Sequence, residues 1–352
     1  MNVRQQVFDD EAFPPDLRHR ESQIQQVIRL LHRAREKRQG VLITGPSGVG
    51  KTVLGRMVLT QYAREHGLGW TWIQTLGLTT GDVFRKAIRG AGDTVADNAP
   101  NAELPRRLRN AIDGRHVLLL DEGDDLAGTG TVGKLASVPG VEVIIIVHNP
   151  DDWLARAESS VRQRLHGGRV SLSRYGVDEL ADILADRARV GLGDDVVSRR
   201  QLETIADDVA GVARDGIQTL RAAAELADER DHSRIRDGDV DDAYERARSR
   251  IREANLSSLP FHHLVLYELI REAGELTGRQ LHARYEEVEE HVYANRQWMP
   301  IGRRDRRNKL DKLLEYDLIE RYQVDHRWVY SAVTPSLKSN RSITETVTAA
   351  TT

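Results

Sequence analysis

Cysteine is absent from this sequence, and so are long apolar runs. Without cysteine the chain can form no disulfide, no thiol nucleophile and no cysteine metal site, which favours a reducing compartment. No run approaches the roughly 18 apolar residues that cross a bilayer, and the N-terminus lacks the apolar core of a signal peptide. We therefore expect a cytoplasmic protein with no membrane role.

The chain also lacks a strong excess of either charge, since 51 Lys and Arg stand against 54 Asp and Glu, a formal net charge of −3. So small a charge does not indicate a polyanionic partner, and any nucleic-acid binding needs a local basic patch. Aromatic residues are only 5% of the 352 residues and charged residues are 30%, which is typical of a helix-rich protein. At roughly 100–200 residues per domain, this length predicts two or three domains.

Short apolar runs alternate with helical patterns in the first half of the chain. The runs occupy residues 41–43, 70–73, 117–120, 141–147 and 169–172. Continuous apolar strands separated by helices are typical of a parallel sheet covered on both faces. The first half is therefore predicted to be an α/β domain.

The second half has a different composition. Four helical patterns without strands follow residue 176, and they predict an all-helical domain. Beyond residue 255, three helical patterns and two strands predict a winged helix-turn-helix. The C-terminal residues are rich in Ser and Thr, so we expect them to be disordered. The expected boundaries are 1–175 for the α/β core, 176–254 for the helical domain, 255–335 for the winged helix and 336–352 for the tail.

A complete phosphate-loop motif follows the first strand. Its glycines let backbone N–H groups surround phosphate oxygens, and the helix N-terminus that follows adds a positive dipole. Lys51 is expected to reach the β- and γ-phosphates of ATP or ADP, and the Thr52 hydroxyl to bind magnesium. The motif consists of Gly45, Pro46, Ser47, Gly48, Val49, Gly50, Lys51 and Thr52.

Two later strands end in polar residues that suit the same site. The strand at 117–120 is followed by Asp121, which would hold magnesium through water, and by Glu122, which would orient or deprotonate the attacking water. The strand at 141–147 leads to Asn149, which could position that water or could simply cap the next helix. Asp124 and Asp125 are more typical of a solvated loop face.

A basic stretch lies in the predicted winged helix. In a helix-turn-helix the second helix enters the major groove by its N-terminal residues, and arginine there binds phosphates or guanine edges. The turn at residues 324–327 would form the wing, whereas Trp328 and Tyr330 are expected to pack in the core. The candidate contacts to double-stranded DNA are Arg303, Arg304, Arg306, Arg307 and Arg327; the alternative is a solvated basic helix face.

The order of these features resembles the AAA+ replication initiators of archaea, relatives of the eukaryotic origin-recognition and helicase-loading ATPases. Four further segments are similar to motifs of that family: Leu-Arg-His-Arg-Glu at 17–21, Val-Arg-Gln-Arg-Leu at 161–165, Gly-Val-Ala-Arg-Asp-Gly at 211–216, and Leu-Thr-Gly at 276–278 with Tyr-Glu-Glu at 285–287. The resemblance covers about residues 8–333. It implies a phosphate-loop AAA+ core, an all-α lid and a C-terminal winged helix.

The resemblance also implies roles for four residues. His19 and Arg20 would lie beside the adenine. Arg164 would face the γ-phosphate of a neighbouring subunit, and Arg214, in the lid, would sense the γ-phosphate of its own chain. These roles imply self-association on DNA.

Several positions depart from the family pattern. His148, Asn149 and Pro150 stand where the family usually has Ser-Asn-Asp, and Gly123 stands where an apolar residue is usual. Gln163 replaces the usual Ser before the arginine. The family carries a helical insertion that grips DNA, and the short stretch between Asp121 and Asn149 offers no clear place for it.

The leading hypothesis is an ATP-switched DNA-binding protein, associated with the nucleoid, that recognises an origin and recruits a replicative helicase. Hydrolysis of ATP to ADP and phosphate would be slow and would act as a release step. One alternative is an ATP-dependent DNA-binding regulator or plasmid-maintenance protein without helicase loading. Another is a protein-remodelling AAA+ ATPase whose winged helix binds protein.

Overall fold

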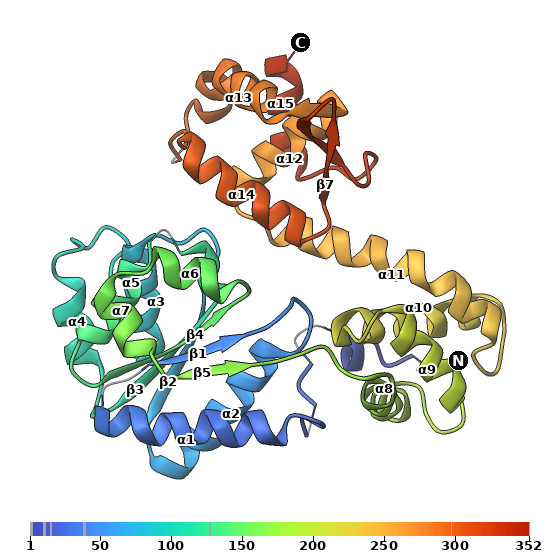
Figure 1. The fold of residues 1–352 in the computed structure, drawn as a ribbon, viewed down its shortest axis with the longest axis horizontal. Coiled ribbons are helices and arrows are strands. Elements are labelled where there is room, and N and C mark those ends of the chain that lie inside the picture. Colours follow the sequence, from blue (N-terminus) through green and yellow to red (C-terminus); the bar gives the residue numbers. More distant parts are fainter. Residues whose placement is uncertain are drawn as a thin grey trace. The chain divides into compact units, whose positions relative to one another are not determined.

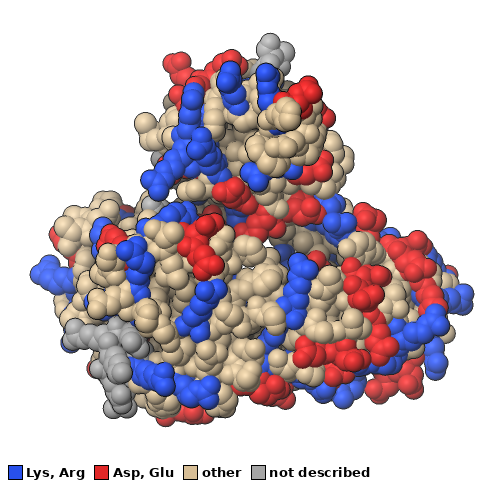
Figure 2. Space-filling model, viewed as in Figure 1, with Lys and Arg blue, Asp and Glu red and all other residues tan. Residues whose placement is uncertain are grey.

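The structure, a computed structural model, describes residues 3–9, 12–14, 16–37, 40–126, 128–296 and 298–351. The chain divides into two compact units, residues 1–244 and 245–352. None of the helices in these described ranges is long and apolar enough to cross a membrane. Figure 2 shows basic and acidic side chains interspersed over the visible surface, in keeping with the small net charge.

Unit 1 contains a five-stranded parallel sheet in the order β2-β3-β4-β1-β5. The strands are β1 (Val41–Thr44), β2 (Gly69–Gln74), β3 (His116–Asp121), β4 (Val141–Val147) and β5 (Arg169–Ser171). All five strands lie where the apolar runs predicted them. Because the strands are parallel, β1, β3 and β4 end at one edge, where the predicted nucleotide residues follow them.

Both faces of this sheet are buried, as the continuous apolar strands predicted. Along β3, Val117 and Leu119 join one apolar cluster while Leu118 and Leu120 join another. Helices α1 (Glu21–Lys37) and α2 (Lys51–His66) cover the first face. The second face carries α3 (Thr80–Gly90), α4 (Leu104–Ala111), α5 (Gly130–Ser137), α6 (Pro150–Arg156) and α7 (Ser159–Leu165) (Figure 1). The α/β prediction is confirmed.

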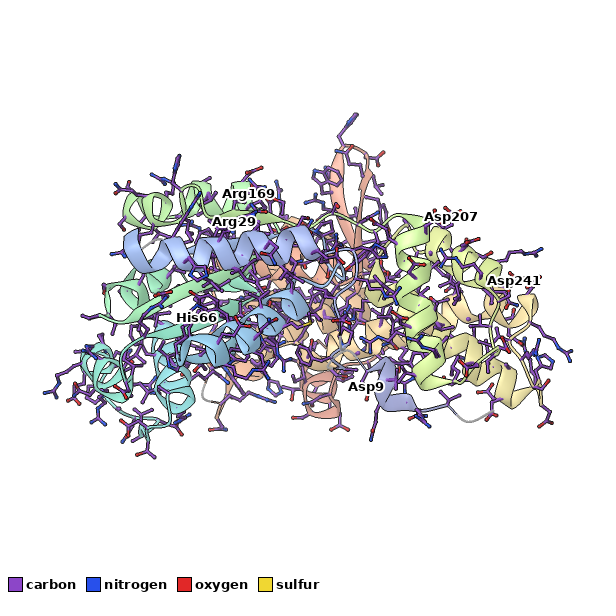
Figure 3. The ribbon with its side chains drawn as sticks, turned by 90° about the horizontal axis from the view of Figure 1, so that it is seen from below. Asp9, Arg29, His66, Arg169, Asp207 and Asp241 are labelled. Atoms are coloured by element: carbon purple, nitrogen blue, oxygen red, sulfur yellow. The ribbon has the colours of Figure 1, made fainter. Side chains whose placement is uncertain are left out.

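The lid of unit 1 is built from α8 (Val177–Gly191), α9 (Arg199–Asp208) and α10 (Ala213–Glu229). A short 3-10 helix near the N-terminus, η1 (Gln5–Phe8), packs against α8 and α10 of this lid. Phe8 is fully buried, and its carbonyl accepts a hydrogen bond from Gln218 of α10 at 2.8 Å. Asp9, labelled in Figure 3, pairs with Arg221 at 3.2 Å. The N-terminal segment is therefore part of the lid's packing.

Unit 2 begins within the long helix α11 (Asp237–Ser258). It continues with α12 (Phe261–Ala273), β6 (Glu275–Thr277), α13 (Gly278–Tyr293), α14 (Arg303–Glu315), β7 (Ile319–Val324) and β8 (Arg327–Ala332). The three strands form an antiparallel sheet in the order β6-β8-β7. This order of elements is that of a winged helix-turn-helix. The sequence analysis missed β6, a strand of only three residues.

The C-terminal tail differs from its prediction. Residues 341–351 form α15 (Arg341–Thr351), whereas we expected residues 336–352 to be disordered; Thr352 lies outside the described residues. Ile343 and Val347 are four residues apart, so they lie on one helical face, and both are buried. The composition of the tail did not reveal this buried face, because only a few apolar residues form it. The expected boundary between core and lid stays a prediction, since the contacts separate only two units.

Candidate functional site

The phosphate loop occupies the turn between β1 and α2, as its motif predicted. Helix α2 begins at Lys51, directly after Gly50, whose φ of 91° is left-handed. Lys51 Nζ donates to the carbonyls of Gly45 at 2.8 Å and Pro46 at 2.6 Å. The lysine therefore lies across its own loop, at the N-terminus of a sixteen-residue helix, where the helix dipole favours an anion.

The lid contacts this loop directly. The backbone N–H of Arg214, at the start of α10, donates to the carbonyl of Gly48 at 3.1 Å. A Cβ on Gly48 would lie 2.6 Å from Val212, so a larger residue could not sit there without displacing the lid. Arg214, predicted from the lid motif alone, is thus placed at the phosphate loop by the structure.

Asp121 lies beside Thr52, as expected for two ligands of one magnesium ion. The Thr52 hydroxyl donates to Asp121 Oδ2 at 2.8 Å. Oxygen donors of this kind are what magnesium prefers, and the ion usually takes only one or two protein ligands together with phosphates and water. Among the described residues no group of three or more His, Asp or Glu side chains could hold a metal. The pair therefore suits an ion that arrives with a nucleotide.

Glu122 follows Asp121 in a left-handed conformation with φ 55°. Its carbonyl and that of Asp121 both accept from the Thr75 hydroxyl, at 2.8 and 2.6 Å. Gly123 has a packing reason, because a Cβ there would lie 2.5 Å from Ile145. The indole N–H of Trp153 also donates to the Gly123 carbonyl at 2.9 Å. Glycine at position 123, which departs from the family pattern, is thus explained by the close approach of Ile145.

Asn149 acts as a helix cap in this structure. Its side chain accepts from the backbone of Asp152 and donates to the Asp152 carboxylate at 2.7 Å, at the start of α6. Of the two roles weighed for Asn149, capping is the one that these contacts display. Asp124 was expected on a solvated loop face, but it accepts from the backbone N–H groups of His148 and Asn149. It thus joins the ends of β3 and β4.

His19 and Arg20 lie where the lid meets the core. His19 Nε2 pairs with Asp182 of α8 at 3.1 Å. Arg20 is only 3% exposed, stacks 3.7 Å over the ring of Tyr175, and donates to the Ser173 carbonyl. Burial raises the pKa of Tyr175, and the nearby Arg20 partly opposes that shift. Tyr175 also bonds through its backbone N–H to Gly211, so these groups join the lid and the core.

Arg164 does not lie with the other predicted site residues. Its carbonyl accepts from Gly40, which precedes β1, whereas the phosphate loop follows β1 at the opposite end of the strand. The guanidinium donates to the Ala136 carbonyl at 3.3 Å and borders a cavity of about 170 Å³. Arg164 therefore cannot reach the phosphate loop of its own chain.

The basic helix α14 presents two different sets of arginines. Arg304 and Arg307 are exposed. Arg303 is exposed as well but pairs with Glu286 of α13 at 3.2 Å. Arg306 is 4% exposed, pairs with the same carboxylate at 3.0 Å and stacks 4.4 Å from the Tyr285 ring. The prediction of Arg306 as a DNA contact is wrong, because its position on the helix faces α13.

Glu286 of α13 therefore pairs with two arginines of the basic helix. Hydrogen bonds from Arg303 and Arg306 lower the pKa of the Glu286 carboxyl.

The predicted wing is a tight turn between β7 and β8. Its residues Asp325 and His326 both have positive φ, which is the geometry of a two-residue hairpin turn, and Arg327 is exposed beside them. Trp328 is 49% exposed under Arg321, so its expected place in the core is wrong.

Comparisons with known proteins agree with this geometry. A family model described as "AAA ATPase domain" matches residues 16–254. The chain is 31% identical over 329 residues to "ORC1-type DNA replication protein 9" of Halobacterium salinarum, an alignment that covers 91% of this chain and 90% of that one. The chain belongs to the ORC1-type DNA replication protein family. Another member from the same organism, "ORC1-type DNA replication protein 1", is 28% identical over 79% of this chain and 93% of its own length.

The ORC1-type fold is also found in solved structures. The "Aeropyrum pernix ORC1 protein in complex with DNA" has a TM-score of 0.68 at 22% identity and covers 97% of this chain and 94% of that one. At this identity the likeness concerns the fold. It confirms the predicted AAA+ architecture, and the ORC1-type relatives confirm the predicted resemblance to archaeal replication initiators.

Sequence reasoning missed three residues that contact the predicted site residues. Tyr175 contacts Arg20 and the lid, Trp72 contacts Asp121, and Glu286 holds Arg303 and Arg306. Tyr175 and Trp72 belong to no motif, and Glu286 lies in the Tyr-Glu-Glu segment at 285–287, to which the sequence analysis gave no role. Only the proximity created by folding distinguishes them.

Proposed function

We propose that this chain is an ATP-switched DNA-binding protein of the replication-initiator type, which recognises an origin and recruits a replicative helicase. The observation that carries the proposal is the bond of 3.1 Å between the Arg214 backbone and the Gly48 carbonyl. This bond joins the lid to the phosphate loop, so a change of nucleotide on the loop would change the position of the lid. Family membership supports the link to replication.

At the nucleotide, the chain's residues would divide the work. Lys51 binds the phosphates, Thr52 and Asp121 hold magnesium, and Arg214 senses the γ-phosphate. Magnesium would neutralise phosphate charge. Glu122 would accept a proton from the attacking water, and Asn149, at the tip of the neighbouring strand, would position that water. Slow hydrolysis to ADP would then end the ATP-bound state.

At the DNA, exposed arginines would supply the contacts. Arg304 and Arg307 lie on the accessible face of α14, Arg303 lies beside them, and Arg327 lies at the wing. Arg164, remote from its own phosphate loop, would face the nucleotide of a second copy when copies associate on DNA. Exchange of ATP for ADP would change how firmly these surfaces hold the duplex.

The test is duplex binding followed by fluorescence anisotropy, with ATP, with ADP and without nucleotide, at several salt concentrations. We expect affinity to differ between the ATP and ADP states. We also expect Glu122→Gln to retain ATP and keep the ATP-state affinity for longer than the unaltered protein. Equal affinity in all three states would contradict the switch, and no affinity for any duplex would contradict the DNA-binding function.

A second candidate is a DNA-binding regulator or plasmid-maintenance protein without helicase loading. Between β3 and β4 the described residues hold a single α-helix, α5, of eight residues, so this part of the core offers little surface for gripping DNA. Mapping of bound chromosomal sites by immunoprecipitation separates the two candidates. Enrichment at replication origins supports the initiator, and enrichment at promoters or on a plasmid supports the regulator.

A further inference from the structure

The carboxylate of Asp121 is held at both of its oxygens. The backbone N–H of Glu122 donates to Oδ1 at 3.0 Å. The indole Nε1–H of Trp72 donates to Oδ2 at 3.3 Å, the same oxygen that accepts from the Thr52 hydroxyl. A carboxylate oxygen has two acceptor sites, so Trp72 and Thr52 can share Oδ2. Two N–H donors on two different oxygens fix the plane of the carboxylate.

The indole of Trp72 is itself held in place by Arg56. The guanidinium of Arg56 lies 4.3 Å from the centre of the Trp72 ring and 4.3 Å from the centre of the Phe13 ring. Thr52 and Arg56 are four residues apart on α2, so both project from the same side of that helix. One face of α2 therefore carries Thr52, which would bind magnesium, and Arg56, which supports the indole of Trp72. That indole in turn orients Asp121.

Phe13, at the outer end of this stack, follows a segment that is bonded to the lid. Arg187 of α8 donates to the Ala12 carbonyl at 3.0 Å and to the Val7 carbonyl at 2.5 Å. Phe8 is fully buried in the same segment. A continuous series of contacts thus leads from the lid through Phe13, Arg56 and Trp72 to Asp121.

We propose that Trp72 is a positioning residue for the magnesium carboxylate Asp121, and that the stack with Arg56 and Phe13 holds its indole in the required orientation. Magnesium demands near-ideal octahedral geometry, so a carboxylate free to rotate binds it more weakly. This inference rests on the proposed nucleotide function. It assigns to a strand residue outside every motif a role in how tightly magnesium joins the nucleotide.

The test compares Trp72→Phe with the unaltered full chain by calorimetry. Phenylalanine keeps an aromatic ring against Arg56 but removes the N–H donor. We expect nucleotide affinity in EDTA to stay within about twofold, and the magnesium concentration needed for half-maximal tightening to rise about three- to tenfold, as for loss of a long hydrogen bond to a charged group. Trp70→Phe is the matched control, since Trp70 lies two residues earlier on β2 and packs against the same apolar cluster as Trp72.

Two further readouts distinguish positioning from a general loss of structure. In an Asp121→Asn background, Trp72→Phe should have no additional effect on the magnesium dependence. Addition of magnesium to the nucleotide-loaded protein should change the tryptophan emission, and the change should persist in Trp70→Phe but be lost in Trp72→Phe. Phe13→Ala, at a side chain that is 43% exposed, should shift the magnesium dependence in the same direction by a smaller factor.

Each result decides the matter. If Trp72→Phe binds nucleotide and magnesium like the unaltered protein, or if its effect is equally large in the Asp121→Asn background, the positioning role is overturned while the nucleotide function stands. If the unaltered protein binds no nucleotide in either condition, the proposed function fails, and the role of Trp72 fails with it.

Discussion

A few side chains and one glycine decide how the nucleotide site is closed. Gly48 has a φ of 73°, and its missing Cβ leaves room for Val212 and Arg214 of the lid. Left-handed backbone is strained for residues with a Cβ, so this position combines a conformational and a steric requirement. Lys51 then lies across the loop and donates to two of its carbonyls. A phosphate that entered the loop would offer this ammonium group a charged acceptor in place of those carbonyls.

Lys51→Ala is predicted to abolish nucleotide binding without unfolding the chain. In the proposed site the ammonium group meets the β- and γ-phosphates, and charge-assisted bonds of this kind are strong. We expect affinity for ATP and ADP to fall by at least about a hundredfold. Calorimetry measures it, with circular dichroism to check the fold. Lys86→Ala, at an exposed lysine of α3, is the control, and near-normal ATP affinity in Lys51→Ala would remove the lysine from the site.

At the scale of elements, α14 shows how one helix serves two purposes. Arg303 and Arg306 are three residues apart, as are Arg304 and Arg307, so the two pairs follow different lines along the helix. The first pair meets Glu286 of α13, and the second remains exposed. The first line of arginines binds α14 to α13, and the second line is the proposed contact to DNA.

Alanine variants should separate these two lines. Arg304→Ala and Arg307→Ala should each weaken duplex binding and reduce the slope of log affinity against log salt by about 0.9 if the lost contact is to phosphate. Their melting temperatures should be unchanged. Arg306→Ala should instead lower the melting temperature, because it removes a buried side chain that stacks on Tyr285 and donates to the His282 carbonyl. Anisotropy and thermal unfolding measure the two effects; a stable Arg306→Ala with a DNA defect alone would contradict the assignment.

Helix α12 carries a buried titratable group with a predictable effect of pH. His263 is fully buried, and among the described residues neither ring nitrogen has a hydrogen-bond partner. Burial, with smaller contributions from Lys309, Lys312 and His262, lowers its pKa to about 2. In the unfolded chain a histidine titrates near 6.5. Between these values the unfolded state binds more protons, so stability is complete above the unfolded pKa and falls as the pH decreases.

We therefore expect the free energy of unfolding to fall between pH 7 and pH 5, with a slope of up to about 1.4 kcal/mol per pH unit for this group. His263→Leu should make the slope shallower. It should not abolish it, because burial also lowers the pKa values of His262 and His282. Urea unfolding of both proteins at a series of pH values measures this, and identical slopes would show that His263 is not the group responsible.

At the scale of the whole molecule, the lid is tied to the core from two directions. The phosphate loop bonds to Arg214, and the N-terminal segment packs on α8 and α10 before the chain enters α1. Between them lies Arg20, stacked on Tyr175, whose backbone reaches Gly211. Within unit 1 the lid therefore contacts both the phosphate loop and the segment that precedes α1.

Arg214→Ala should uncouple nucleotide identity from DNA affinity. The variant keeps the backbone bond to Gly48 but loses the guanidinium, so ADP should bind as in the unaltered protein. The preference for ATP over ADP should shrink by about tenfold or more, as for a lost charge-assisted contact. The difference in duplex affinity between the two nucleotide states should shrink with it. Calorimetry and anisotropy measure the two effects, and an unchanged ATP preference would exclude Arg214 as the sensor.

The sequence by itself determined the features whose signals are local. The phosphate loop, the five apolar strands and the acids at the end of β3 are each encoded by consecutive residues, because period, turn chemistry and motif spacing depend on near neighbours. The order of these features was enough to recognise the family. Asp121 and Thr52, 69 residues apart, were paired correctly because parallel strands end at one edge of a sheet.

Tertiary structure decided which side chains remain available. Four arginines of α14 look alike in sequence, yet only folding against α13 buries Arg306 and pairs Arg303 with Glu286. Trp72 belongs to no motif, and only the pairing of β2 with β3 brings it to Asp121. The tail was misjudged because α15 buries Ile343 and Val347 by packing against α12 and α13, which lie far away in the sequence. Burial and pairing depend on residues distant in the chain, and no local pattern contains them.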